Sequence, residues 1–409
     1  MTSPLIDGPA AWRRLAAILA LCTTGSIGMW SVVVALPHVQ AEFGATRSEA
    51  SLPYTLLMLG FSAGSILMGR MTDRFGAMPP VLAGAVMLSG GYVVSGLAPS
   101  LLVFALAHGV LIGLLGASAT FAPLMADASL WFQRRRGIAV AIAACGNYLA
   151  GAVWPPVLDL LISAHGWRVA HLVIGAFCLV TMLPLALLLR ARPPVLRAAP
   201  MTAAEQREAD RPLGLSKNAL TAVLCCAGLG CCVAMAMPQV HIVAYCGDLG
   251  YGVARGTEML SLMLAFGIVS RIASGFIADR IGGLATLLLG SVLQGVALAF
   301  YLFFDGLASL YVISAMFGLF QGGIVPSYAV IVRELFPPKE AATRVGIVLM
   351  STMVGMALGG WLSGLIFDLS GSYAMAFLNG VAWNAMNVAI VATLLLRARR
   401  GRGRGAVAA

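Results

Sequence analysis

One arginine lies in the middle of an otherwise apolar stretch. Arg271 belongs to residues 257–279, a run long enough to cross a membrane as a helix. At 1.5 Å per residue it would lie ~12 Å from the end of that helix near Asp279, close to the middle of a bilayer. A guanidinium there costs ~2.5–3.5 kcal/mol on insertion scales. Because its forked N–H donors match a carboxylate and it stays charged, Arg271 indicates an anion site or a fixed ion pair.

Few acids match the depth of Arg271. Gly267, one helical turn before it, has no side chain. Asp127 falls near one end of its apolar run, whereas Asp159 and Asp368 fall near the opposite ends of theirs. This mismatch favours a bound anion, and a structural ion pair remains the alternative.

Polar and aromatic side chains at similar depths are candidates to line the same site. A small carboxylate needs a charged clamp, one or two hydroxyl or amide donors and an apolar wall. Such residues are also ordinary groups in helix packing, which is the competing interpretation of each one. The candidate substrate-binding residues beside Arg271 are Tyr328, Asn147, Phe121, Trp30, Asn384, Asn387 and Gln321.

Two histidines and two acids could carry coupling protons. His38 follows Pro37 at the end of the first apolar run, and His241 lies at a similar level in the seventh. A histidine can titrate near neutral pH, although one at a membrane interface need have no role in transport. Asp127 and Asp159 are the acidic candidates.

Composition places the chain in a membrane. Of its 409 residues 60% are hydrophobic and 10% charged, against about 25% charged in soluble domains. In lipid, apolar runs must be helical because every backbone polar group needs an internal partner. The sequence therefore predicts an all-α membrane protein with twelve transmembrane helices. The predicted helices cover approximately 15–37, 51–71, 78–98, 101–128, 137–162, 169–190, 218–246, 257–279, 284–304, 307–333, 343–367 and 373–397.

The basic residues predict the orientation. The net charge is +10, yet Lys and Arg fall in short gaps between apolar runs, which excludes a nucleic-acid-binding surface. With the N-terminus inside, 22 of the 26 lie on the cytoplasmic side. We therefore expect a protein of the cell (inner) membrane with both termini in the cytoplasm.

Two halves of the chain repeat one another. Gly69, Asp73, Arg74 and Gly76 recur 206 residues later as Gly275, Asp279, Arg280 and Gly282. Asp159 and Asp368 belong to a second matching register, with an offset of 209. The repeat predicts two pseudo-symmetric six-helix bundles with a site between them. We refer to 1–190 as the N-terminal half and 218–397 as the C-terminal half; 191–217 is the expected cytoplasmic linker, and 398–409 a basic cytoplasmic tail.

The loop Gly-x-x-x-Asp-Arg-x-Gly, present twice, resembles the signature loop of the major facilitator superfamily. The resemblance extends over essentially the whole chain and implies transport by alternating access. Charged residues at helix ends can contact the carbonyl groups of a neighbouring helix. Asp73, Arg74, Asp279 and Arg280 are therefore the gating candidates; in the alternative, they only mark helix ends.

Arg271, four residues before Gly275, sits where monocarboxylate transporters and oxalate/formate exchangers carry a substrate arginine. The segment from Trp131 to Ala139 is similar to the aromatic-basic entrance to helix 5 of that family. Two departures matter: Gly267 replaces an acid found in mammalian-type carriers, and residues 343–367 lack the second central cation of the oxalate exchangers. The single charge favours a monovalent anion.

The leading hypothesis is therefore a secondary carrier of lactate- or pyruvate-like monocarboxylates that works by proton symport or anion exchange. The alternative is an efflux pump of the same fold for other organic anions or amphipathic compounds. No nucleotide-binding loop and no metal- or acyl-transfer motif is present, so we expect neither enzymatic activity nor a cofactor. We also expect the protein to be a monomer.

Overall fold

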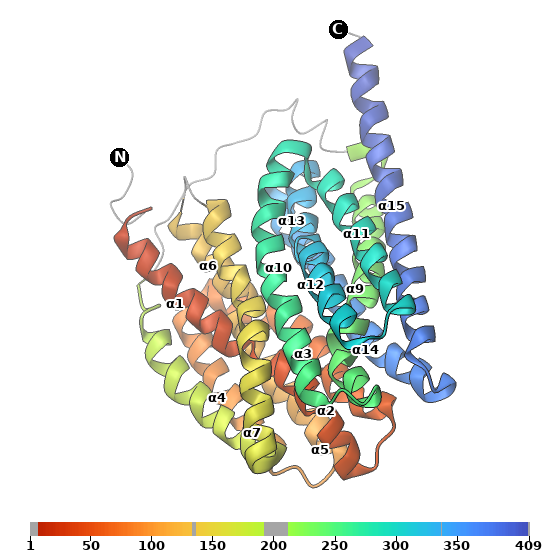
Figure 1. The fold of residues 1–409 in the computed structure, drawn as a ribbon. Helices are drawn as coiled ribbons and strands as arrows, with labels where there is room; N and C mark the ends of the chain where they lie inside the picture. The colour runs from red at the N-terminus through yellow and green to blue at the C-terminus, as the bar shows by residue number, and fades with distance from the viewer. Residues whose placement is uncertain (1–6, 133–135, 192–211, 337, 408–409) are drawn as a thin grey trace.

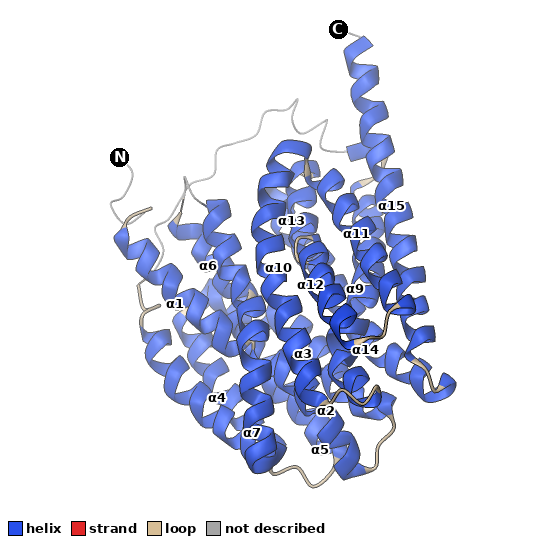
Figure 2. Ribbon diagram, viewed as in Figure 1, coloured by secondary structure: helices blue, strands red, loops and turns tan. Residues whose placement is uncertain are grey.

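A computed structural model describes residues 7–132, 136–191, 212–336 and 338–407, and none of these residues lies in a strand (Figure 2). The N-terminal elements are α1 (Pro9–Gly25), α2 (Ile27–Phe43), α3 (Arg47–Phe75), α4 (Met78–Gly96), α5 (Leu101–Leu106), the π-helix η1 (Ala107–Gly116), the 3-10 helix η2 (Ala117–Thr120), α6 (Ala122–Trp131) and α7 (Arg136–Leu187). The C-terminal elements are η3 (Pro212–Gly214), α9 (Lys217–Asp248), α10 (Val253–Ile281), α11 (Gly283–Phe303), α12 (Leu307–Gln321), α13 (Ile324–Leu335), α14 (Pro338–Ser370) and α15 (Tyr373–Val407). Most of the predicted linker and Arg134 and Arg135 of the aromatic-basic segment lie outside the described residues.

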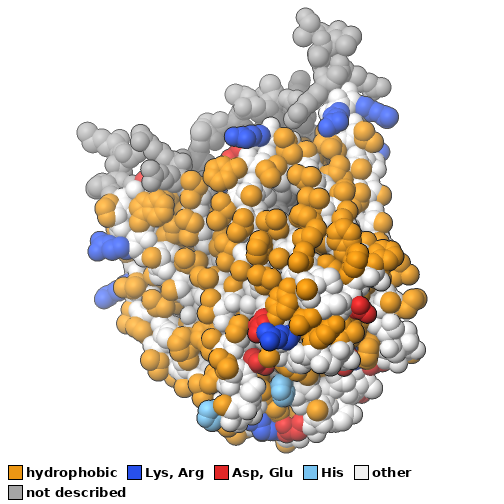
Figure 3. Space-filling view, in the orientation of Figure 1, with side chains coloured by type: hydrophobic (Ala, Val, Ile, Leu, Met, Phe, Trp, Pro, Cys, Tyr) orange, Lys and Arg blue, Asp and Glu red, His pale blue; other side chains and the backbone are white. Residues whose placement is uncertain are grey.

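The helices form a multi-pass membrane protein. Eleven helices of the described chain are long and apolar enough to cross a bilayer. Apolar side chains cover the middle of the molecule, and several Lys and Arg residues lie toward the end that carries the termini (Figure 3). The predicted all-helical membrane class is confirmed. The predicted helices 137–162 and 169–190 form one element, α7, of 52 residues, in which Gly166 alone is non-helical, with φ 80° and ψ 159°.

The helix ends follow from local chemistry. Thr46 and Glu49 form a capping box at the start of α3, in which the Thr46 side chain accepts the Glu49 N–H and the Glu49 carboxylate accepts the Thr46 N–H. The two repeated loops end alike, because Gly76 and Gly282 take φ values of 87° and 82° that disfavour a side chain.

Two membrane helices of related position are broken near their middle. In the N-terminal half, the span from Leu101 to Trp131 changes from α- to π- to 3-10 helix, and Phe121 has φ −120° and ψ −86°. In the C-terminal half, α12 and α13 are separated at Gly322 and Gly323. Such breaks free backbone carbonyls in the interior, where they must find partners.

Glycines allow backbones to approach closely, as the sequence predicts. A Cβ on Gly60 would lie 2.0 Å from the carbonyl oxygen of Gly109, and one on Gly355 would lie 2.6 Å from that of Leu229. A Cβ on Gly322 would lie 2.3 Å from the Gly267 oxygen, so α12 and α10 touch through their backbones.

The two ends of the bundle differ in how the halves meet. We call the end where α1 begins and α15 ends the terminal face, and the opposite end the sealed face (Figure 1). At the sealed face, Arg47 Nη2 lies 2.6 Å from Asp248 Oδ2. The Asp368 carboxylate accepts the backbone N–H groups of Arg47 and Ser48 at 2.8 and 2.7 Å. These bonds tie the C-terminal half to the first turn of α3, where an anion is favoured.

At the terminal face, the hydrogen bonds and ion pairs among the described side chains stay within one half. The Glu340 carboxylate forms ion pairs with Arg344 at 2.8 Å and with Lys217 at 3.1 Å. The pair with Lys217 links α14 to α9. The bond from Arg344, then that from Lys217, lowers the pKa of Glu340 below its usual value. The halves are therefore linked at the sealed face and in the middle, but not by described side chains at the terminal face.

Candidate functional site

Arg271 lies at the contact between the halves, and its hydrogen bonds go to neutral groups. It belongs to α10 and is 9% exposed. Its Nη1 donates to the carbonyl of Ala144 in α7 at 2.6 Å, and its Nε donates to that of Gly322 at 3.3 Å. The second carbonyl is one of those freed where α12 ends. The break in the helix thus supplies an acceptor for the buried cation.

An aromatic ring faces the guanidinium. Arg271 Cζ lies 3.9 Å from the centre of the Tyr148 ring, which α7 contributes from the N-terminal half. No carboxylate of the described chain lies within ion-pair distance of Arg271. The arginine is therefore held by both halves while its charge remains uncompensated.

A buried amide completes this cluster. Gln321 is fully buried, and its Oε1 accepts the hydroxyl of Tyr148 at 3.2 Å. Its Nε2 has no acceptor among the described residues. An unpartnered buried donor costs about 1–3 kcal/mol, so an acceptor on a ligand would be favoured here. Arg271, Tyr148 and Gln321 together offer a cation and free N–H donors to an oxygen-rich anion.

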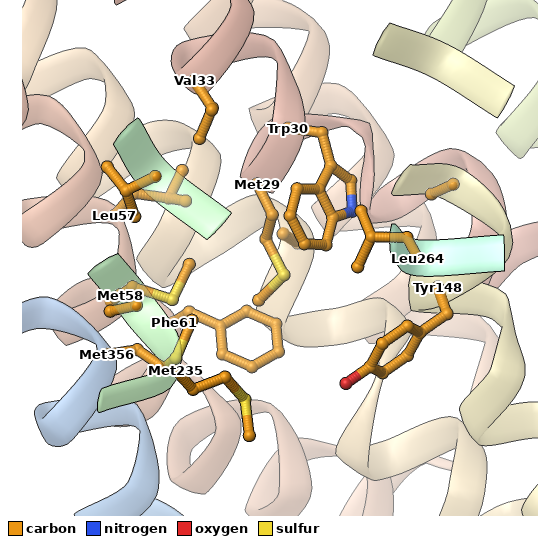
Figure 4. Close-up of a cluster of buried hydrophobic side chains, with 14 of the residues drawn as sticks. Met29, Trp30, Val33, Leu57, Met58, Phe61, Tyr148, Met235, Leu264 and Met356 are labelled. Carbon is orange, nitrogen blue, oxygen red and sulfur yellow. The ribbon is translucent and has the colours of Figure 1, made fainter. Parts of the chain in front are cut away.

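An apolar wall of side chains from both halves adjoins Tyr148 (Figure 4). Four of its members are methionines, which adapt their shape more readily than branched residues. The Trp30 ring and Tyr148 lie on either side of Leu264 in this view. The labelled residues are Met29, Trp30, Val33, Leu57, Met58, Phe61, Tyr148, Met235, Leu264 and Met356.

Three of the predicted lining residues lie at or beside this wall. Trp30 Nε1 donates to the carbonyl of Asn147 at 3.1 Å, and Asn147 Nδ2 lies 3.4 Å from the sulfur of Met29. Asn147 Oδ1 is buried without a donor among the described residues. Phe121 packs on Phe61, with ring centres 5.8 Å apart. Asn147 and Trp30 thus border the cluster around Arg271, and Phe121 supports the wall.

Tyr328, Asn384 and Asn387 instead form a separate network inside the C-terminal half. Tyr328 donates to Asn387 at 3.1 Å, and Asn387 donates to the Ser291 hydroxyl at 2.8 Å. Asn384 donates to the Ser291 carbonyl at 2.9 Å. All three side chains are buried, and none of these bonds reaches Arg271. The network joins α11, α13 and α15, while a role in substrate binding stays a prediction.

Asp127 has a cationic partner of its own, which is not Arg271. Arg14 of α1 binds it through Nε at 2.7 Å and Nη2 at 2.9 Å. The same Nη2 donates to the Leu189 carbonyl at 3.3 Å, and the guanidinium lies over the Trp131 ring. This buried pair fastens α1 to α6 and to the end of α7. Proton coupling through Asp127 stays a prediction, one that would require breaking this pair.

The other three coupling candidates lie toward the sealed face. His38 and Glu258 are titratable neighbours of Asp159, which makes no hydrogen bond in the described chain. Two predicted coupling residues, His38 of α2 and Asp159 of α7, thus lie close together. His241 is fully buried, and its Nε2 donates to the Gly360 carbonyl at 2.8 Å.

The predicted gating residues lie at the terminal face. Arg74, Asp279 and Arg280 are exposed, and no described ion pair holds them. The side chain of Asp73 is outside what the structure describes. Their gating role stays a prediction that concerns the state in which the terminal face is closed.

Sequence reasoning missed Tyr148, Arg14 and Arg47. Gly267 was the available signal for Tyr148: a Cβ on Gly267 would lie 2.5 Å from Tyr148 Cε1, so the missing side chain marks the place of the ring. Arg14 and Arg47 carry no local sequence signal, because their partners Asp127 and Asp248 are 113 and 201 residues away.

Comparisons with known proteins agree with this architecture. The family model described as Major Facilitator Superfamily matches residues 16–309 and 259–408. Monocarboxylate transporter 13 of Bos taurus is 29% identical over 355 residues, covering 84% of this chain and 79% of the relative. Monocarboxylate transporter 11 of Mus musculus is 29% identical over 391 residues, covering 91% of this chain and 84% of the relative. The crystal structure of a bacterial homolog of the human lysosomal transporter Spinster, in an inward-facing and occupied conformation, has a TM-score of 0.72 at 14% identity and covers 98% of each chain.

Proposed function

This chain belongs to the Major Facilitator Superfamily, and we propose that it is a secondary active transporter of small monocarboxylates, of the size of lactate or pyruvate. The observation that carries the proposal is Arg271, a buried cation between the halves whose described partners are all neutral. Relatives named monocarboxylate transporters support the same substrate class. A visiting carboxylate would supply the missing negative charge.

The proposed architecture has twelve spans in two six-helix bundles. The non-helical Gly166 divides α7 into two segments, each long enough to cross a bilayer. Residues 1–190 would form one bundle and 218–397 the other, with 191–217 as the linker. The distribution of Lys and Arg supports cytoplasmic termini and an inner-membrane location. The sealed face would then be the outer one, and the chain would stand open to the cytoplasm.

The site supports a monovalent substrate. Arg271 contributes one charge, and the structure adds no second cation to its contacts. Gln321 Nε2 offers a further donor, and the wall of methionine and aromatic side chains suits a short apolar tail.

Anion exchange is the coupling mode that the electrostatics favour. After release of the substrate, Arg271 remains charged and buried, which raises the free energy of the empty carrier during its return. A second anion would remove this obstacle. Proton symport would require a titrating group, and the proximity of His38 to Asp159 supports this pair as the candidate.

The alternative function, export of amphipathic compounds, has one observation in its favour. A shallow, open groove of about 440 Å³ lies between α3 and α14. Its lining is apolar apart from Ser62 and Arg70. An amphipathic anion with an apolar body would suit this groove better than lactate does.

Ligand-dependent thermal unfolding tests the proposed substrate class. The purified carrier would be heated with lactate, pyruvate, acetate, succinate or an amphipathic sulfonate. A ligand at 100 times its Kd stabilises the folded state by about 2.7 kcal/mol. We expect stabilisation by the monocarboxylates, its loss in Arg271→Gln, and its retention in Arg255→Gln, which changes an exposed arginine of the same helix. Lactate stabilisation that survives Arg271→Gln contradicts the proposal, and a response to the sulfonate alone favours the alternative.

Proteoliposomes distinguish the coupling modes. Uptake of labelled lactate that requires unlabelled lactate inside, and does not respond to an imposed pH difference, supports exchange. Uptake driven by the pH difference and lost in Asp159→Asn supports symport.

A further inference from the structure

We propose, on the basis of the proposed function, that Tyr148 is a positioning residue of the anion site: its ring holds Arg271 without neutralising it, and its hydroxyl fixes the amide of Gln321 for substrate. The two parts of the side chain thus act on the two donors of the site. Substrates with an oxygen on the carbon next to the carboxylate would gain from both.

The ring occupies a space that exists only because residue 267 is glycine. A Cβ on Gly267 would lie 2.5 Å from Cε1 and 2.6 Å from Cδ1 of Tyr148. These atoms belong to the ring that lies under the guanidinium. Any side chain at 267 would displace the ring. The position of the Tyr148 ring in α7 therefore depends on the glycine at 267 in α10, which belongs to the opposite half.

The partners of Arg271 attract it without cancelling its charge. An aromatic face is negative through its quadrupole and carries no net charge. Ala144 and Tyr148 lie four residues apart, so they share one face of α7, which receives the guanidinium from α10. An acid in place of the ring would pair with Arg271 and compete with a carboxylate ligand. The uncharged ring and carbonyl thus orient Arg271 and leave its charge available to a carboxylate ligand.

The hydroxyl determines which end of the Gln321 amide is left without a partner. Because Oε1 accepts the Tyr148 O–H at 3.2 Å, Nε2 is the end left unpartnered. Gln321 precedes Gly322, whose carbonyl binds Arg271 Nε, so the amide and the guanidinium are adjacent. A carboxylate on Arg271 would bring an oxygen of the neighbouring carbon within the region of Nε2.

The experiment compares lactate, which has this second oxygen, with propionate, which lacks it. Full-length carrier would be assayed for Kd by thermal shift and for KM and Vmax by exchange in proteoliposomes. Tyr148→Leu removes ring and hydroxyl, and we expect a roughly 5- to 30-fold weaker Kd for both anions. Tyr148→Phe keeps the ring, and we expect propionate to bind normally while lactate weakens by roughly 3- to 10-fold.

A matched control separates positioning from packing. Tyr54 is also buried and also crosses between halves, where its ring lies 3.1 Å from a Cβ built on Gly360, but it does not face a guanidinium. Tyr54→Leu should lower the melting temperature or Vmax without changing the ratio of lactate to propionate affinity.

The outcomes separate this inference from the proposed function. Loss of binding in Arg271→Gln together with normal affinities in Tyr148→Leu overturns the role of Tyr148 and leaves the anion site standing. If Tyr148→Leu fails to fold, Tyr148→Phe decides: an unchanged lactate-to-propionate ratio overturns the inference, and a selective loss of lactate affinity supports it. Binding that is unaffected by Arg271→Gln removes the site on which both rest.

Discussion

The two halves of the molecule share a plan but place different chemistry at equivalent positions. The offset of 206 residues that relates Gly69 to Gly275 puts Ser65 at the position of Arg271 and Phe61 at that of Gly267. In the N-terminal half, Ser65 donates to the carbonyl of Phe61 in its own helix. In the C-terminal half, glycine leaves room for a ring from the other half, and the arginine reaches across to meet it.

The broken helices show the same division. In the N-terminal half the carbonyl of Thr120, beside the break, accepts the thiol of Cys22 at 2.8 Å. In the C-terminal half the carbonyl of Gly322 accepts the guanidinium of Arg271. In the N-terminal half, the carbonyl beside the break thus binds a neutral thiol. In the C-terminal half, the corresponding carbonyl binds the charged guanidinium. Two halves with a repeated sequence pattern can therefore carry an asymmetric site.

The largest expected effect concerns the acids at the terminal face, Asp127 and Glu334. Asp127 is buried against Arg14, whereas the hydrogen bonds of Glu334 within the described residues come from the backbone N–H of Gly283, at 3.1 and 3.2 Å. Asp127→Asn should lower the free energy of unfolding by about 3–5 kcal/mol, because it leaves a buried unpaired guanidinium. Glu334→Gln should cost about 0.5–1.5 kcal/mol. Thermal unfolding in detergent measures both.

A double variant, Arg14→Met with Asp127→Leu, serves as the control for this pair. Removal of both charges should restore most of the lost stability. If Asp127→Asn is as stable as the parent and abolishes only proton-driven uptake, Asp127 acts in coupling rather than in structure.

Moving the charge between halves tests whether the site depends on its surroundings. We expect the double variant Arg271→Ser with Ser65→Arg to lose roughly 2.5–3.5 kcal/mol of stability, because the new arginine has no prepared acceptors. It should not regain lactate binding, since Tyr148 is placed to face position 271 in α10 and position 65 lies in α3. Thermal shift with and without lactate checks both statements; recovered binding would show that charge alone makes the site.

The third comparison concerns Asp368 and its repeat mate Asp159. Asp368 binds two backbone N–H groups of the opposite half, whereas Asp159 has no described hydrogen bond. Asp368→Asn should weaken the sealed face by about 1–2 kcal/mol, a roughly 5- to 30-fold shift toward opening. Asp159→Asn should leave this equilibrium within about twofold.

Distances between spin labels provide the measurement for this pair. Labels at Ala41 and Ala374, exposed at the sealed face in opposite halves, would report opening in a Cys226→Ser background. A population unchanged by Asp368→Asn would mean that the Arg47–Asp248 pair alone keeps the face shut.

The smallest effect on stability is expected at Gly69 and Gly275. A Cβ at either position meets nothing within 4 Å, so Gly→Ala at each should change the free energy of unfolding by less than about 0.5 kcal/mol. If the repeated loops close the terminal face in another state, exchange should nevertheless slow in both variants. Equal exchange rates in the parent and both variants would leave these glycines without a gating role.

The sequence was sufficient for the class of fold and for the isolation of Arg271. Hydropathy predicted the all-helical membrane class, because a long apolar run in lipid satisfies its backbone polar groups as a helix, and depth along the helices separated Arg271 from Asp127 and Asp159. The repeated loops also end alike, at Gly76 and Gly282.

The partners of these charges could not be predicted from the same patterns. Tyr148, Arg14 and Arg47 owe their roles to helices far away in sequence, and hydropathy does not indicate which faces meet. Helix α12 ends at Gln321, and Gly322 and Gly323 pack against α10 at this break. Pro326, four residues after Gly322, has no N–H to bond the Gly322 carbonyl. The π-helix of η1 had no sequence signal that we could identify.

If the proposed site binds substrate, the methionines of the central wall would make it more selective for one end of the substrate than for the other. Met29, Met58, Met235 and Met356 come from four helices of both halves, and their unbranched thioethers can rearrange around tails of different length. Arg271 and the fixed amide of Gln321 leave no such freedom at the other end. Such a carrier would be selective for the carboxylate group of its substrate and tolerant of the length of the apolar tail. It would transport a series of homologous acids at rates that change gradually with tail length.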